Sequence, residues 1–177
     1  MKIKSKHLAD GLRRMSAAAA VVGMAVATPA LVSAQESIDW LTLGSDYAHT
    51  RYIPASEINA DNFENLETAW VWDGSSFNAS SGRATPSYID GILYTVAGDR
   101  RHVVAIEPQT GETIWSYREP HTFRYEYSMR KDYGKGVAYS EVDGRGVIYM
   151  VSPGFFLTAL DAKTGAPLED FGHEIGV

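Results

Sequence analysis

The feature that most constrains the fold of this chain is an internal repeat. Residues 103–117 align without gaps on residues 157–171, with identical Ala, Thr and Gly positions and chemically similar residues at several others. The residues before each copy, 91–96 and 146–151, also match. Each unit has the pattern strand, hairpin turn, strand, acidic-x-x-Thr-Gly turn, strand, and it recurs after about 54 residues. Repeats of short strands at such a period are typical of β-propeller blades.

Short apolar runs bounded by turn signals predict the strands of the first unit. The predicted strands are residues 87–89, 92–96, 103–106 and 113–117. Asp90-Gly91 predicts a tight hairpin between the first two, and the glycine of the Thr-Gly pair supplies the positive φ of a tight turn. Four short strands cannot bury themselves as one isolated sheet, so they need packing partners. The predicted fold is therefore all-β, a β-propeller built from four-stranded blades.

The chain has 177 residues, which is short for such a fold. Propellers take roughly four to eight blades to close, and the repeat accounts for about two. We expect residues 35–177 to be the N-terminal part of a larger propeller, consisting of a leading segment and about two blades. A complete two-bladed protein is disfavoured, because it would leave long strand edges exposed.

Composition and charge exclude several other classes of protein. The chain is 45% hydrophobic and has 16 glycines and 7 prolines, which excludes a collagen-like, coiled-coil or wholly disordered chain. The net charge of −6 argues against a nucleic-acid partner, because nucleic-acid-binding surfaces are basic. The absence of cysteine excludes a disulfide framework, a thiolate zinc site and a cysteine nucleophile.

Residues 1–34 have the pattern of an export signal. Five basic residues lie before an apolar, alanine-rich run from Met15 to Val32, and Val32-Ser33-Ala34 offers the small residues of a cleavage site. A membrane anchor is the alternative, but Pro29 and the small-residue end favour cleavage. We therefore expect a periplasmic protein without a membrane span after cleavage.

The repeat and its flanks resemble the quinoprotein dehydrogenases, eight-bladed propellers that bind pyrroloquinoline quinone (PQQ). The resemblance rests on residues 39–54 and 58–62 as a leading segment, Ala84-Thr85-Pro86 in the first blade, Thr110-Gly111 to Trp115 as a tryptophan docking motif, and residues 135–139, 160–165 and 170–172. The last two stretches are most similar to the glucose and quinate dehydrogenase branch. Trp115 is expected to pack between blades.

The resemblance implies site residues as well as a fold. It places Arg83, Lys135 and Ser152 at the cofactor and Asp170 at a Ca²⁺ ion, while the family's catalytic aspartate lies in later blades and has no counterpart here. Arg83 stands where the family has an acidic residue, and Lys135 stands where it has an arginine, which keeps a cation for a quinone carboxylate. Residues 129–134 replace the vicinal cysteine pair of the alcohol-oxidising branch.

Each of these residues also has a simpler interpretation. Lys135 reads equally well as a solvated charge beside Asp132, Ser152 as the end of a strand, and Asp170 as a turn cap, since one carboxylate does not define a hard-cation site.

Three further segments have predicted conformations. Residues 69–72 read as a strand and residues 60–66 as a short helix. The alternation of Phe123, Tyr125 and Tyr127 with charged residues predicts a strand with one aromatic face.

Two functions remain open from the sequence. The first is a periplasmic PQQ-dependent dehydrogenase that oxidises alcohols or sugars by hydride transfer to the quinone, with a cytochrome or quinone as electron acceptor. The second is a cofactor-free propeller that acts as a binding scaffold. The departures at Arg83 and Lys135 favour the scaffold, whereas the leading segment and Asp170-Phe171-Gly172 favour the dehydrogenase.

Overall fold

The computed structural model of the protein describes residues 38–78, 83–132 and 134–172. The export signal predicted at residues 1–34 lies outside the described residues. Within them, no helix is long and apolar enough to cross a membrane.

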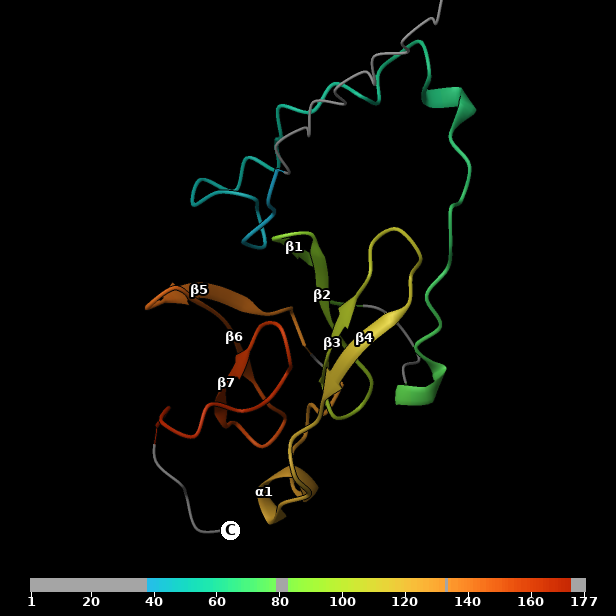
Figure 1. Cartoon of the computed structure of the whole chain (residues 1–177). Helices are drawn as coiled ribbons and strands as arrows, with labels where there is room; N and C mark the ends of the chain where they lie inside the picture. The colour runs from blue at the N-terminus through green and yellow to red at the C-terminus, as the bar shows by residue number, and fades with distance from the viewer. Residues whose placement is uncertain (1–37, 79–82, 133, 173–177) are drawn as a thin grey trace, which may run out of the picture. The chain divides into compact units, whose positions relative to one another are not determined.

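The first repeat forms a four-stranded antiparallel sheet with its strands in chain order (Figure 1). The strands are β1 (Ser87–Ile89), β2 (Ile92–Ala97), β3 (His102–Ile106) and β4 (Thr113–Tyr117). Asp90 and Gly91 both have positive φ, 47° and 79°, as the type I′ hairpin turn requires. All four strands predicted from the sequence are confirmed within a residue at either end.

The second repeat forms a three-stranded antiparallel sheet in the described residues. Its strands are β5 (Ala138–Val142), β6 (Arg145–Val151) and β7 (Leu157–Asp161). Asp143 and Gly144 repeat the positive-φ hairpin of the first sheet. After the Thr-Gly turn, a bridge between Leu160 and Pro167 brings the chain back beside β7, where the first repeat has its fourth strand.

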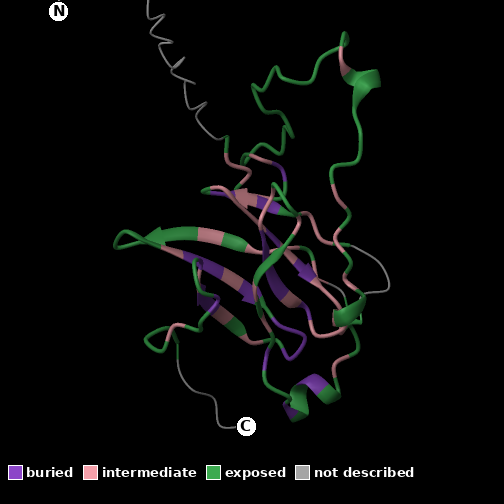
Figure 2. Cartoon of the chain, turned by 45° about the vertical axis from the view of Figure 1, so that its right-hand side comes forward, coloured by how far each residue is buried: buried purple, intermediate pink, exposed green. Residues whose placement is uncertain are grey.

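The hydrophobic core contains side chains from both sheets. Figure 2 shows the buried residues in the central strands, while β5 and the segment before β1 are mostly exposed or half-buried. The core residues are Ile89, Tyr94, Val96, Val103, Ala105, Ile148, Met150, Leu160 and Ala162. Tyr94 also joins the two sheets, because its hydroxyl donates to the carbonyl of Ala162 at 3.0 Å. Burial raises the pKa of Tyr94 to about 12, which keeps this donor protonated.

A tryptophan docks on each Thr-Gly turn. Trp115 of β4 lies against Gly165, and its indole Nε1 donates to the Ala162 carbonyl at 3.0 Å. Gly165 has a φ of +71°, and a methyl group there would overlap the ring, so two constraints require glycine. Trp115 therefore packs between the repeats as predicted.

Two of the predicted conformations are wrong. Residues 69–72 form no strand, because they have no strand partner among the described residues. Residues 123–127 do not form a strand either: α1 (Phe123–Glu126) is a single helical turn whose Thr122 side chain accepts from the Tyr125 N–H at 3.1 Å. The spacing of the outer aromatics is that of i and i+4, and Phe123 and Tyr127 lie 4.5 Å apart on the exposed side.

The helix predicted at residues 60–66 is shorter than expected. A single 3-10 turn, η1 (Phe63–Asn65), lies within it. A second 3-10 turn, η2 (Ser75–Phe77), precedes the first sheet. The Phe77 ring lies 5.5 Å from Trp72 and 5.0 Å from His102, so the segment before β1 covers part of the first sheet.

Candidate functional site

Three loops lie together at one end of the strands of both sheets, and we call them the loop cluster. They are the β2–β3 turn (residues 98–101), the β4–β5 connection (residues 118–137) and the β6–β7 turn (residues 152–156). The Arg101 guanidinium on the first loop donates to carbonyls of the other two, at Ser152 and Arg130, over 3.2 and 2.7 Å. The loop cluster is thus held by side chains that cross between repeats.

A buried carboxylate joins the second and third loops. Glu119 is 2% exposed, and its carboxylate accepts from the Gly154 N–H at 3.1 Å. Burying a charge is costly unless it is paired and hydrogen-bonded. The backbone carbonyl of Glu119 accepts from Arg100 at 3.1 Å, and the charges of Glu119 and Arg101 attract each other.

Cations surround the aromatic ring at the centre of the connection. The Arg100 guanidinium and the Lys131 ammonium lie 4.6 and 4.7 Å from the centre of the Tyr125 ring. Burial raises the pKa of Tyr125. The negative face of the ring attracts both cations. These contacts hold two positive charges together in a chain whose net charge is negative.

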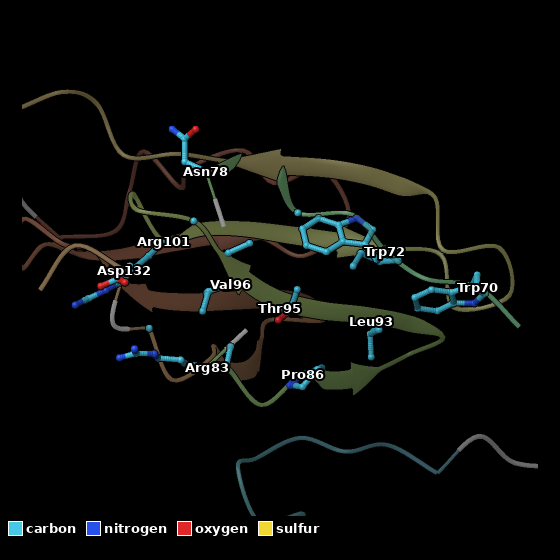
Figure 3. A pocket seen from close by; sticks show the side chains of 16 residues that line it. Trp70, Trp72, Asn78, Arg83, Pro86, Leu93, Thr95, Val96, Arg101 and Asp132 are labelled. Carbon is cyan, nitrogen blue, oxygen red and sulfur yellow. The ribbon is translucent and has the colours of Figure 1, made fainter. Parts of the chain in front are cut away.

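Two hollows open beside the loop cluster. The first, of about 470 Å³, is lined by Trp70, Trp72, Arg83, Arg101 and Asp132 among others. Figure 3 shows Arg83, Arg101 and Asp132 toward one end of it and Trp70 with Leu93 toward the other. The second, of about 390 Å³, has Lys135, Tyr149 and Leu157 in its lining. Arg101 and Gly134 line both, and both volumes are in the range of small-molecule sites.

The structure brings two of the predicted cofactor residues onto neighbouring segments. Arg83 lines the first hollow and Lys135 lines the second, and both are exposed. Their segments are joined because the Thr85 N–H donates to the Lys135 carbonyl at 3.1 Å. Gly136 permits this approach: its φ is +141°, and a methyl group there would lie 2.9 Å from the Thr85 carbonyl oxygen.

The other two predicted residues lie apart from this pair. Ser152 follows the end of β6 and is fully buried, and its hydroxyl accepts from the Phe156 N–H at 3.2 Å. It is not part of the lining of either hollow. Asp170 is exposed in the segment after β7.

Calcium binding at Asp170 stays a prediction. Across residues 38–78, 83–132 and 134–172, no three histidine, aspartate or glutamate side chains gather so that they could hold a metal ion. A Ca²⁺ ion takes six to eight oxygen ligands, and Asp170 supplies one carboxylate.

Sequence reasoning missed Arg101 and Glu119, which organise the loop cluster. The available signal was Asp99-Arg100-Arg101 in a turn between two apolar strands, where charged residues are ordinarily solvated. The nearly complete burial of one arginine of the pair, at 9% exposure, depends on carbonyls that are remote in sequence.

Paired antiparallel sheets with an indole docked on the turn of the following repeat define a β-propeller. A family model described as "Glucose/ethanol/alcohol dehydrogenase, beta-propeller domain", of the PQQ type, matches residues 40–177. The chain belongs to this family of PQQ-dependent dehydrogenase propellers.

Individual relatives agree with this assignment. The quinohemoprotein alcohol dehydrogenase of Comamonas testosteroni is 37% identical over 75% of this chain and 18% of its own length. The 1-butanol dehydrogenase (cytochrome c) of Thauera butanivorans is 30% identical over 92% of this chain and 22% of its own length. The chain thus spans about a fifth of the curated relatives it matches.

Solved structures support the same fold. The crystal structure of the Comamonas testosteroni quinohemoprotein alcohol dehydrogenase superposes with a TM-score of 0.59 at 34% identity, over 77% of this chain and 20% of that one. A europium-containing methanol dehydrogenase superposes with a TM-score of 0.56 at 23% identity, over 73% of this chain and 22% of that one, and supports the fold alone.

The loop cluster fits the chemistry of PQQ, a planar quinone that carries carboxylates. Arg83 and Lys135 supply exposed cations at the two hollows. Arginine and lysine form charge-assisted hydrogen bonds with carboxylates.

Proposed function

We propose that residues 35–177 serve as the leading segment and first two blades of a periplasmic PQQ-dependent dehydrogenase that oxidises alcohols or sugars. The observation that carries the proposal is the cationic loop cluster at two hollows in a chain of the PQQ propeller family. The names of the relatives, which include alcohol, 1-butanol and glycerol dehydrogenases, support small hydroxyl compounds as the substrate class.

PQQ supplies the hydride-accepting quinone when it is bound. In this proposal Lys135 and Arg83 bind cofactor carboxylates, Lys135 as a point charge and Arg83 as a two-pronged donor. The Thr85–Lys135 backbone hydrogen bond keeps the segments of Arg83 and Lys135 together at the same end of the strands. Ser152 fixes the β6–β7 turn through Phe156, so its hydroxyl acts by shaping the turn.

We assign no residue of this chain as the base that accepts the proton of the substrate hydroxyl. The electron acceptor is proposed to be a cytochrome or a quinone, and the printed name of the Thauera relative, which includes cytochrome c, supports the first. The family resemblance extends to Ca²⁺, for which Asp170 supplies one exposed carboxylate among the described residues, and the proposal includes no step at calcium.

The proposal is tested with the protein expressed at the full length of its coding sequence. PQQ is titrated into the apoprotein, and dye-linked oxidation of ethanol, glycerol and glucose is then measured. We expect PQQ to bind and at least one substrate to be oxidised. Lys135→Ala should weaken PQQ binding by about tenfold, the scale of one charge-assisted hydrogen bond. Failure of the wild-type protein to bind PQQ would contradict the dehydrogenase.

A cofactor-free scaffold is the second candidate, and the observation that favours it is Arg83 in place of the family's acidic residue. The same titration separates the two. A scaffold binds no PQQ, and its Lys135→Ala variant is indistinguishable from wild type.

Export has its own test, independent of the cofactor. We propose that the chain is cleaved after Ala34 and released to the periplasm. N-terminal sequencing of the protein from a periplasmic extract should begin at Gln35. An intact N-terminus in the membrane fraction would instead support the anchor.

A further inference from the structure

We propose that Arg101 is a positioning residue for the cofactor site. Its guanidinium joins the β2–β3 turn to two other loops, the connection that leads to Lys135 and the turn that carries Ser152. The proposal rests on the proposed function for the identity of the ligand, and on the hydrogen bonds of Arg101 for the role itself.

Arg101 makes three hydrogen bonds, two to carbonyls of the neighbouring loops and one to the last carbonyl of β6. One terminal nitrogen donates to Val151 and Ser152 at 3.1 and 3.2 Å, and the other donates to Arg130 at 2.7 Å. Val151 is the last residue of β6, Ser152 is the first residue of the β6–β7 turn, and Arg130 lies on the connection that leads to Lys135. A planar guanidinium that bonds two loops at once fixes their separation, which a flexible ammonium does less well.

Arg101 forms part of the wall of both hollows. Burial lowers the pKa of its guanidinium, while the charges of Glu119 and Asp132 oppose that effect. Arginine remains protonated in proteins, so a fixed positive charge lies between the hollows. Displacement of Arg101 would move the walls of both.

The equivalent turn of the second repeat separates this role from a backbone requirement. Phe155 occupies the position of Arg101, with a φ of +61° against +47°. The turn hydrogen bonds also correspond: Arg101 N–H to the Gly98 carbonyl at 3.2 Å, and Phe155 N–H to the Ser152 carbonyl at 3.0 Å. Phe155 is 65% exposed, whereas Arg101 is 9% exposed.

The same left-handed backbone thus carries an outward phenylalanine in one repeat and an inward arginine in the other. An arginine with positive φ is uncommon, because its side chain opposes that conformation. The turn does not need arginine, so we assign the arginine to the contacts that it makes.

The test compares three variants of the protein expressed at the full length of its coding sequence. Arg101→Met removes the guanidinium and keeps an unbranched side chain, and Arg101→Lys keeps the charge without the fork. Arg145→Met is the matched control, because Arg145 lies at the start of β6 with a half-exposed side chain and pairs with Asp161 of β7, outside the loop cluster. Two readouts are used: amide hydrogen exchange of the apoprotein, and the Kd for PQQ.

We expect Arg101→Met to speed exchange at residues 128–132 and 151–157, with little change in the core strands. The Kd for PQQ should rise by about tenfold, because the competent loop arrangement would then be populated about a tenth of the time and the apparent Kd rises by the inverse of that fraction. Arg101→Lys should show smaller increases than Arg101→Met, both in the exchange rates of these loops and in the Kd for PQQ. Arg145→Met should match wild type in both.

The outcomes distinguish the inference from the proposed function. Unchanged exchange in these loops for Arg101→Met overturns the inference. Faster exchange with an unchanged Kd also overturns it, because the loops are then held without consequence for the cofactor. If the wild-type protein binds no PQQ, the proposed function fails together with the cofactor role, and the exchange data report the loop contacts alone. If Arg101→Met does not fold, Arg101→Lys decides: equal exchange and Kd to wild type would overturn the role of the fork.

Discussion

Residues 98–117 of the first repeat and residues 152–171 of the second run through equivalent turns and strands with different side chains. Arg101 and His102 of the first repeat correspond to Phe155 and Phe156 of the second. The first repeat buries its arginine against the second, and the second turns its phenylalanine outward. The same backbone conformation therefore carries side chains with different roles. The side chains that donate hydrogen bonds between the repeats, Tyr94, Arg101 and Trp115, belong to the first repeat.

Indole docking is common to both repeats. Trp70 lies on Gly111, and its Nε1 donates to the Pro108 carbonyl at 2.9 Å, just as Trp115 does at Gly165 and Ala162. The source of the indole differs, since Trp115 belongs to β4 and Trp70 belongs to a segment outside the described sheets. The same docking contact is therefore supported by a sheet in one case and by a single segment in the other.

The acidic turns differ in the number of hydrogen bonds that the carboxylate accepts. Asp161 accepts from the N–H groups of Lys163 and Thr164 at 3.0 and 2.9 Å and from the Thr164 hydroxyl at 2.9 Å. The Glu107 carboxylate accepts from the Gln109 N–H at 3.3 Å. The shorter aspartate reaches its own turn, as is typical of Asx turns.

The largest expected difference between the repeats is at the docked indoles. Trp115→Ala should lower the free energy of unfolding by about 3 kcal/mol, because a half-buried ring leaves a cavity between the sheets. Trp70→Ala should cost about 1 kcal/mol, the scale of one hydrogen bond, since its segment can detach locally. Denaturant unfolding of both variants measures this. Equal losses would mean that residues 69–72 are as firmly held as β4.

The acidic turns should differ by a smaller amount. Asp161→Ala should cost about 1 to 2 kcal/mol, because it removes several turn hydrogen bonds, whereas Glu107→Ala should stay within about 0.5 kcal/mol. Thermal unfolding of the pair gives the comparison. Asp161→Asn is the control: it keeps an acceptor for the turn and loses only the charge that pairs with Arg145. An Asn variant as unstable as the Ala variant would assign the effect to the ion pair.

The smallest difference should appear as a pH dependence. Burial lowers the pKa of His102 below its ordinary value of 6.5. The unfolded chain therefore binds this proton at a higher pH than the folded protein. The stability that His102 contributes is complete above pH 6.5 and is lost as the pH falls toward its folded pKa.

Replacement of His102 by the residue of the second repeat isolates this effect. His102→Phe should flatten the stability profile just below pH 6.5 and leave the profile above it unchanged. Unfolding curves at several pH values provide the measurement. A slope that persists in the variant would assign the titration to another group.

The sequence predicted the first sheet well because its strands are short apolar runs between strong turn signals. Asp90-Gly91 specifies its hairpin locally, and the Thr-Gly turn likewise needs only adjacent residues. Lys135 and Arg83 were predicted through the family resemblance, and the structure places them on joined segments without testing their roles.

The remaining features depend on contacts that are remote in sequence. Phe123, Tyr125 and Tyr127 alternate as a strand would, but Thr122 caps a helical turn, and these residues pair with no strand in the described part of the chain. Residues 69–72 have strand-like composition, yet a strand requires a neighbour. Arg101 reads as a surface residue until the carbonyls of Val151 and Arg130 surround it.

We propose that these two repeats present their loop cluster to PQQ. The most direct test of this proposal is a structure of the protein, expressed at the full length of its coding sequence, determined with PQQ. We expect the quinone beside the loop cluster, with cofactor carboxylates within hydrogen-bond distance of Lys135 and Arg83 and with Arg101 still bonded to the Ser152 carbonyl. A quinone bound away from these loops, or no bound quinone at saturating concentration, would contradict it.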